Sequence, residues 1–408
     1  MLNFLFIIKA INKNYFKKNG ELNIISKIKY NFPVGSYDFH KHPNLDFQFN
    51  RLVTNGGNFE EVKEVATKIE DFNDWKRELI ALAEKSLTEN RLLNSAAYYR
   101  AAEFFVSPHD PDKHILYDKF IELIYKVYDE LPEIKVKIPY ENSYLPGYHF
   151  KNEENKGTVV IFGGYDSLIE ESFKLNSYIR DAGYEVIAFE GPGQGAARRK
   201  NNLVMTHEWE KPVKAVLDHF NLKDIILIGV SLGGYLSLRA AAFEPRISKV
   251  VAFGTIYDFF QVITYKGGPE ARKSTENLLD SNQVDLFNNI LQESMKNDLL
   301  VNWGVNHGMY VFGVTSPFEY MEKVRLYSTE EISEKITQDV LIMTGAKDHF
   351  IPLEMFYKQI EVLKNVRSLT ARMFTEKENA ASHCQMDNRK IALDVILNWI
   401  EQINKRDY

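Results

Sequence analysis

The residue best placed to do chemistry is Ser231, in the pentapeptide Gly-Val-Ser-Leu-Gly at residues 229–233. Six apolar or β-forming residues (225–230) precede this serine, and a helix-compatible stretch (235–242) follows it. This order predicts a strand, a sharp turn and a helix, with the serine hydroxyl exposed at the carboxyl edge of a sheet. The flanking glycines fit because a side chain there would collide with the neighbouring strand or helix. The alternative is an ordinary strand–helix turn in which Ser231 only caps the helix.

A serine hydroxyl becomes a nucleophile when a base takes its proton and an acid orients that base. In sites built on such a turn, the acid and then the base follow the serine along the chain. Asp348 comes shortly after a predicted strand at 340–343, and His383 lies in the loop before the last predicted helix. We therefore predict Ser231, Asp348 and His383 as nucleophile, acid and base.

Other side chains compete for these roles. Asp258 follows a predicted strand and is an alternative acid, while Asp348 has the alternative role of capping the next helix. His349 and His307 are alternative bases, but His349 directly follows the predicted acid, so its ring should point elsewhere. His307 is expected either to contact substrate or to satisfy a buried backbone group. Cys384 adjoins the predicted base and not a strand–helix turn, which disfavours a thiol nucleophile.

A tetrahedral intermediate needs hydrogen-bond donors for its negatively charged oxygen. The backbone N–H of Leu232, directly after the serine, is the first predicted donor. The second is the N–H of Tyr165, with Gly164 as the alternative, in the glycine-containing loop after the strand at 158–162. The sequence Gly-Pro-Gly-Gln-Gly at 191–195 lacks the Lys-Ser/Thr pair of a phosphate-binding loop, so we interpret it as a structural turn near the site.

Short apolar strands alternate with helices from about residue 134, which predicts a mainly parallel α/β sheet covered by helices on both faces. The predicted strands are an antiparallel pair at 134–139 and 148–151, followed by 158–162, 185–189, 225–230, 250–253, 340–343 and 371–374. The predicted helices between and after them are 167–181, 207–220, 353–363 and 391–403. Residues 255–337 interrupt the alternation, and we predict that they form a helical lid insertion above the catalytic edge.

The first part of the chain, residues 1–132, is predicted to be a helical N-terminal cap domain. Apolar residues recur at helical spacing in the segments 58–89, 90–105 and 110–131. The remaining residues, 133–408, are predicted to form the catalytic domain, which includes the lid.

Composition limits the partners and the compartment. The net charge of −6 gives no basis for a broad nucleic-acid-binding surface. The single cysteine excludes an intrachain disulfide and fits a reducing compartment. Residues 1–8 lack the features of a signal peptide, and no apolar run reaches the ~18 residues of a membrane span. We predict a cytoplasmic protein without a nucleic-acid or membrane partner, a metal or a cofactor, and with a solvated basic arm at residues 1–30.

Several motifs together indicate a family. They are FGGYDSLIEE (162–171), EGPGQG (190–195), WEKPVKAVLD (209–218), GVSLGGYLSLRAAAFEPRI (229–247), NWGVNHGMYVFG (302–313), GAKDHFIP (345–352) and FTEKENAASHCQMDN (374–388). In this order the chain resembles α/β-hydrolases of the 2,6-dihydropseudooxynicotine hydrolase type. These are relatives of polyketide-shortening hydrolases of fungal pigment pathways and of fermentation–respiration switch proteins. The resemblance implies the α/β-hydrolase fold, a helical cap above the active site and a homodimer, and it places the triad on the three residues predicted above.

The resemblance also implies a reaction. Its members hydrolyse a carbon–carbon bond next to a ketone, or an ester, so we expect a small ketone or ester as substrate and an acyl-enzyme intermediate. Departure of a carbanion needs an activating ketone or an added proton donor, and His307 and Tyr257 are candidates for that donor. Together with Asp258 they are the predicted substrate contacts. Acyl transfer by the same residues and a non-catalytic binding protein on the same fold are the alternatives.

Overall fold

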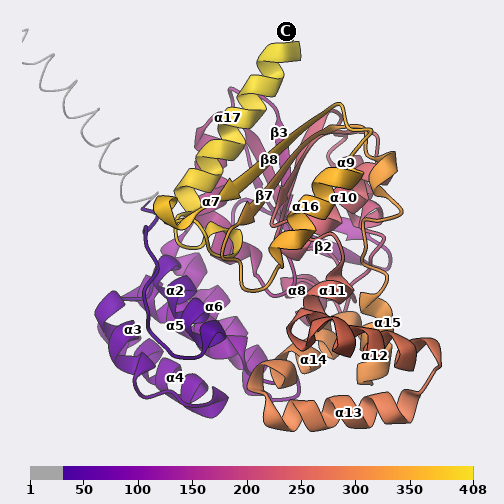
Figure 1. Cartoon of the computed structure of the whole chain (residues 1–408). Coiled ribbons are helices and arrows are strands. Elements are labelled where there is room, and N and C mark those ends of the chain that lie inside the picture. The colour runs from indigo at the N-terminus through magenta and orange to yellow at the C-terminus, as the bar shows by residue number, and fades with distance from the viewer. Residues whose placement is uncertain (1–30, 408) are drawn as a thin grey trace, which may run out of the picture.

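A mostly parallel sheet forms the centre of the protein in a computed structural model, which describes residues 31–407 (Figure 1). The strand order is β1-β2-β4-β3-β5-β6-β7-β8, and β2 runs antiparallel to both of its neighbours. The strands are β1 (Lys135–Tyr140), β2 (Ser143–Phe150), β3 (Thr158–Phe162), β4 (Glu185–Phe189), β5 (Ile225–Val230), β6 (Ile247–Phe253), β7 (Asp339–Gly345) and β8 (Ser368–Phe374). The predicted α/β class is confirmed. The predictions for residues 1–8 and for the basic arm at 1–30 lie outside the described residues.

Helices cover both faces of this sheet, because its central strands are apolar on both sides. Successive residues of β3 alternate between two hydrophobic clusters: Val159 and Ile161 join one, and Val160 and Phe162 join the other. The first cluster includes side chains of α7 (Phe173–Asp181) and α17 (Arg389–Asp407). The second includes side chains of α9 (Glu210–His219), α10 (Leu232–Phe243) and α16 (Leu353–Val362).

Between residue 31 and the first strand, five α-helices extend the first cluster. They are α2 (Pro43–Thr54), α3 (Phe59–Ala66), α4 (Phe72–Thr88), α5 (Leu92–Phe104) and α6 (Asp112–Val127). The helical periodicity at 58–89 therefore belongs to two helices. A new helix begins after Asp71 because its side chain caps α4, accepting the backbone N–H groups of Asn73 and Asp74 at 2.8 Å.

Five α-helices lie between β6 and β7 and form what we call the insertion. They are α11 (Phe259–Thr264), α12 (Gly268–Asp280), α13 (Val284–Asn297), α14 (Leu299–Phe312) and α15 (Pro317–Val324). Figure 1 shows the insertion and the N-terminal helices at the same end of the sheet. They touch where the indole N–H of Trp303 donates to the carbonyl of Phe104 at 3.1 Å, with the two rings stacked 4.9 Å apart. Over residues 31–407, no helix has the length and apolarity needed to traverse a bilayer.

A buried carboxylate ties the N-terminal helices to the sheet domain. Glu103 on α5 is 0% exposed and pairs with three cations, Arg100 at 2.7 Å, Lys113 at 3.0 Å and Arg199 at 2.7 Å. Arg199 belongs to the short helix α8 (Gly195–Arg199), which follows β4. Burial raises the pKa of Glu103, but the three cations outweigh burial and hold that pKa well below its ordinary value. The carboxylate is therefore charged, and it neutralises cations from both parts of the chain.

Replacing Glu103 by Gln should destabilise the fold strongly. The change leaves the three buried cations without their common anion, and removal of one partner from a buried ion pair typically costs about 3–5 kcal/mol. Urea unfolding followed by circular dichroism measures the loss. Glu64→Gln is the control, since Glu64 pairs with Lys68 on the exposed surface and its loss should change little. Equal stability of E103Q and wild type would show that this network does not hold the two parts together.

Candidate active site

Ser231 occupies a strained turn between β5 and α10. Its backbone angles, φ 62° and ψ −122°, lie in a region that residues other than glycine rarely adopt. Its own N–H donates to the carbonyl of Phe253 at 2.8 Å, which holds the turn against β6. A Cβ at Gly229 would collide with the carbonyl oxygen of Gly233, so the turn can be this tight only with glycine there. The serine itself is partly exposed.

The turn brings Ser231 to two residues from distant loops. The Nε2 atom of His383 lies 2.9 Å from the hydroxyl of Ser231, and its Nδ1 atom lies 2.7 Å from the carboxylate of Asp348. Asp348 follows β7 and His383 follows β8, so parallel strands deliver both side chains to the edge where β5 ends. The second oxygen of Asp348 accepts the N–H groups of Phe350 and Ile351 at 2.9 and 3.0 Å, which fixes its orientation.

Electrostatics favours a charged acid beside this histidine. Burial raises the pKa of Asp348, but His383 and the two backbone N–H groups outweigh burial and lower that pKa overall. Burial lowers the pKa of His383, and the nearby Asp348 raises it to a final value well above the usual one. His383 is 8% exposed, and its ring lies near Phe47 of α2 and Phe350, at centroid distances of 6.1 and 5.1 Å. The imidazole is thus shielded from water and held by a carboxylate.

The alternative acid, the alternative base and the candidate proton donor Tyr257 make their contacts away from the Ser231 hydroxyl. The carboxylate of Asp258 accepts the N–H of Gln261 at 2.9 Å and so caps α11. His349 places its Nε2 3.1 Å from the side-chain oxygen of Asn44 on α2, as expected for a ring that points away from the serine. Tyr257 is 7% exposed, and its ring lies below the ammonium of Lys358, 5.5 Å from the ring centroid. None of these three side chains hydrogen-bonds to the serine or imidazole in the described part of the chain.

The loop after β3 approaches the serine closely. An added Cβ at Gly164 would lie 2.7 Å from the amide nitrogen of Leu232 and 2.9 Å from the Cβ of Ser231, so only glycine fits. Across residues 31–407, the backbone N–H groups of Leu232 and Tyr165 donate to no carbonyl. Two uncommitted N–H groups beside a serine are what an oxyanion requires.

The side chain of Gln194 holds this loop from the turn after β4. The amide of Gln194 donates to the carbonyls of Gly163 and Gly164 at 2.7 and 3.0 Å, and its oxygen accepts the N–H of Gly191. Sequence reasoning noticed the Gly-Pro-Gly-Gln-Gly turn that contains Gln194 but missed this function, because the partners lie 30 and 31 residues away.

His307 holds the same loop from the insertion. Its Nε2 lies 3.0 Å from the carbonyl of Tyr165, and its ring stacks on Trp303 at 5.2 Å. Burial lowers the pKa of His307 to about 4, so its ring is neutral at pH 7 and its Nε2–H is available to donate to that carbonyl. Of the two roles that the sequence left open for His307, the structure places it against a backbone group.

Comparison with known proteins agrees with this architecture. The sequence profile of the family described as alpha/beta hydrolase fold matches residues 157–372. Hydrolase acrC of Aspergillus aculeatus is 28% identical over 329 residues, which cover 70% of this chain and 74% of that protein. The 20-hydroxy-prefusarin hydrolase FUS2 of Gibberella moniliformis is 31% identical over 287 residues, covering 63% of this chain and 66% of that protein.

A solved structure shares the fold. The crystal structure of 2,6-dihydroxy-pseudo-oxynicotine hydrolase superposes with a TM-score of 0.60 at 21% identity, covering 86% of this chain and 94% of that one. The family resemblance predicted from the motifs is thereby confirmed. With a family profile that covers more than half of its length, this protein belongs to the alpha/beta hydrolase fold family.

Proposed function

We propose that this protein is a serine hydrolase that works through an acyl-enzyme formed on Ser231. The supporting observation is the continuous hydrogen-bond chain from the serine hydroxyl through His383 to Asp348, at 2.9 and 2.7 Å. Each member performs the task that its geometry allows: the hydroxyl is partly exposed, the imidazole is within proton-transfer distance, and the carboxylate is fixed by two backbone N–H groups.

The reaction follows from these positions. The oxygen of Ser231 attacks the substrate carbonyl carbon while Nε2 of His383 accepts the hydroxyl proton, and Asp348 stabilises the resulting imidazolium. The negative oxygen of the tetrahedral intermediate accepts the N–H groups of Leu232 and Tyr165. Collapse of the intermediate breaks the bond to the leaving group, which takes the proton from His383. Water then repeats the sequence on the acyl-enzyme and releases a carboxylic acid.

The substrate is a small molecule with a ketone or an ester. Two aromatic rings lie beside the triad, since Phe47 and Phe350 are near the imidazole, and in the loop after β3 the ring of Tyr165 lies 5.5 Å from that of Phe259. Such walls favour an apolar or aromatic body next to the reacting carbonyl. Because His307 is neutral and already faces the carbonyl of Tyr165, we assign protonation of a carbanion leaving group to His383.

Two other functions use the same architecture. Acyl transfer needs the same triad and differs only in the acceptor, an alcohol or an amine that replaces water. A binding protein without catalysis would not require the aligned triad or the uncommitted N–H groups, and these features favour an enzyme.

Hydrolysis should be detectable with a panel of β-diketones and nitrophenyl esters. We expect turnover of β-diketones as well as esters, and loss of both activities in Ser231→Ala because the acyl-enzyme can no longer form. Chromatography of the acid and ketone products measures the carbon–carbon reaction, and released nitrophenol measures the ester reaction.

The panel also separates the alternatives. Turnover of esters alone would contradict the carbon–carbon reaction, and products that appear only with an added alcohol or amine would indicate acyl transfer. Wild-type protein that neither turns over any substrate nor reacts with a fluorophosphonate would favour the binding protein.

Asp348→Asn should reduce kcat by about 10⁴-fold, because the imidazole loses the carboxylate that holds its tautomer and orientation. The base must be neutral to accept a proton, and the pKa of His383 is raised by Asp348. Wild-type kcat/KM should therefore fall on the acid side at a pH above the ordinary histidine value of about 6.5. In the variant, this limb should move to lower pH.

The matched variant is Asp258→Asn. Asparagine caps helices as well as aspartate does, so α11 should keep its cap and the loss in kcat should be far smaller. If Asp258→Asn is the crippling change and Asp348→Asn is nearly silent, the acid assignment is wrong.

Gln194→Ala should lower kcat with little change in KM, since the loop that carries the N–H of Tyr165 loses both of its amide contacts. We expect a loss of at least about tenfold, less than the ~10²–10³ typical for removing an oxyanion donor itself. Steady-state kinetics at a temperature where the variant remains folded measures it. Gln338→Ala is the control, because Gln338 also donates to a carbonyl, that of Ala241, but away from the serine. Equal kinetics for both variants would refute this role.

A further inference from the structure

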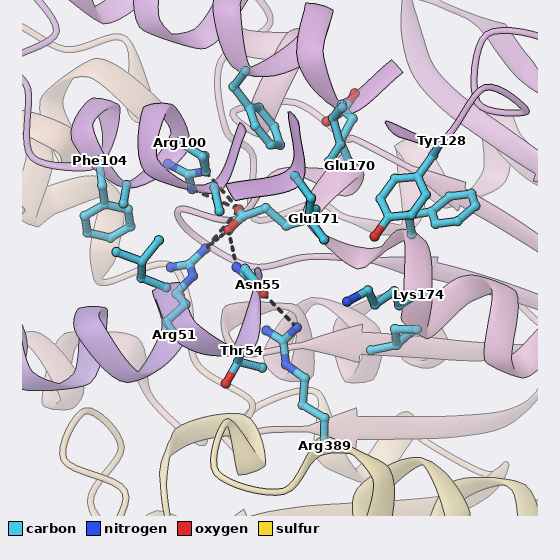
Figure 2. Close-up of a pocket in the computed structure, with 18 of the residues that line it drawn as sticks. Arg51, Thr54, Asn55, Arg100, Phe104, Tyr128, Glu170, Glu171, Lys174 and Arg389 are labelled. Carbon is cyan, nitrogen blue, oxygen red and sulfur yellow. Dashed lines mark hydrogen bonds and ion pairs between the residues drawn. The ribbon is translucent and has the colours of Figure 1, made fainter. Parts of the chain in front are cut away.

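A cavity of about 50 Å³ lies between the N-terminal helices and the sheet domain, and none of the triad residues lines it (Figure 2). Its walls come from α2, α5 and α6 on one side and from the 3₁₀ helix η1 (Ile169–Ser172), α7 and the first residue of α17 on the other. One buried water needs about 10–15 Å³, so the space suits a few waters or one small ligand group.

Two of the four cations in the cavity wall have carboxylate partners. Arg51 pairs with Glu171 and with Asp166, both at 3.0 Å. Arg100 pairs with the same Glu171 at 3.0 Å and with Glu103 at 2.7 Å. Burial raises the pKa of Glu171, but the two arginines outweigh burial and lower that pKa to about 2. This acid is therefore charged, and the two arginines already neutralise its charge.

The other two cations have no carboxylate within ion-pair distance in the described part of the chain. Lys174 makes no hydrogen bond or ion pair within residues 31–407, and Arg389 donates only to the side-chain oxygen of Asn55, at 3.3 Å. Figure 2 shows the ammonium of Lys174 turned toward the guanidinium of Arg389, with Asn55 between Arg389 and Glu171. Burial and then the charge of Arg51 lower the pKa of Arg389 to about 10, and burial and then Arg389 lower that of Lys174. Like charges that face each other in a partly buried space are unfavourable without an anion between them.

Neighbouring polar groups are also placed to donate hydrogen bonds to an anion in the cavity. The hydroxyl of Tyr128 points toward Lys174 in Figure 2 and has no hydrogen-bond partner in the described part of the chain. Gln48 is 6% exposed, and its side-chain amide likewise makes no hydrogen bond there. The remaining acid in the wall, Glu170, accepts the hydroxyl of Tyr148 at 2.7 Å, and burial raises its pKa, which weakens its negative charge at neutral pH. Both a hydroxyl and an amide N–H can donate to an anion.

The start of α17 also favours an anion in the cavity. Arg389 is the first residue of that helix, and the first turn contains no acidic residue. Because the N-terminal end of a helix carries partial positive charge, a cation there is unfavourable and an anion is favoured.

We propose that this cavity is a binding site for a small anion with a carboxylate or phosphate group, held by Lys174 and Arg389 with Tyr128 and Gln48 as further donors. An organic ligand would pack its apolar body against the aromatic part of the wall, formed by Phe104, Phe120 and Phe173. The proposal is independent of the hydrolase reaction, since its residues and those of the triad are different.

Thermal unfolding of the full chain tests the proposal, with inorganic phosphate and benzoate as separate probes and sodium chloride added to keep ionic strength constant. Phosphate or benzoate should raise the melting temperature of wild type in a saturable way. Lys174→Gln and Arg389→Gln should each weaken the apparent affinity at least tenfold. Without ligand, Lys174→Gln should melt no lower than wild type, because it removes one of two like charges. A purely structural lysine would instead lower the melting temperature.

Lys390→Gln is the matched control, since Lys390 neighbours Arg389 on α17 but is exposed and pairs with Asp394. It should bind the probes as wild type does. A response to one probe alone identifies the head group that the site takes and supports the proposal. The absence of a saturable response to either probe, or equal responses of wild type and Lys174→Gln, would overturn it.

Discussion

The positions of the serine hydroxyl and of the N–H groups beside it depend on backbone crowding around Ser231. The serine is held at a positive φ between β5 and α10. An added Cβ at Gly164 or Gly254 would lie 2.9 or 3.2 Å from an atom of Ser231, and one at Gly229 would collide with Gly233 in the same turn. Strain of this kind costs about 1–3 kcal/mol and persists only where the surroundings enforce it. Here the enforcement comes from β6, where the carbonyl of Phe253 accepts the N–H of Ser231 and fixes the turn. The exposed hydroxyl and the nearby N–H groups are consequences of the same close approach.

The loop beside the serine depends on contacts from three parts of the chain. Gln194 holds it from the turn after β4, and His307 holds it from the insertion. The N-terminal helices hold it through Asp166, whose carboxylate pairs with Arg51 and whose carbonyl accepts from Arg100 at 2.7 Å. A loop with two flexible glycines is thus fixed by polar contacts at both its backbone and its side chains. Both helical parts of the chain therefore contribute contacts that position this short segment.

The sequence predicted some features well and others not at all, and the difference is physical. The strands β3, β4 and β5 have the bounds that were predicted, because each is a short apolar run bounded by polar residues or glycine. The break between α3 and α4 was hidden, since apolar residues continue at helical spacing past the capping Asp71. Ser231, Asp348 and His383 were predictable from strand ends and chain order. Arg51, Gln194 and Phe47 were not, because their partners lie from 30 to more than 300 residues away and no local pattern marks them.

Helix α2 touches the site at two points, and these contacts couple it to the base and to the segment after β3. Phe47 lies beside the imidazole, and Arg51, one turn later, pairs with two acids at the loop after β3. Moving these helices away would break the ion pairs of Arg51 and separate Phe47 from the imidazole. The guanidinium of Arg51 lies over the ring of Phe104, 5.2 Å from its centroid, and that ring stacks on Trp303 of the insertion. The N-terminal helices, the loop beside the serine and the insertion are therefore joined through one short run of side chains, so a shift of α2 would disturb the imidazole and that loop together.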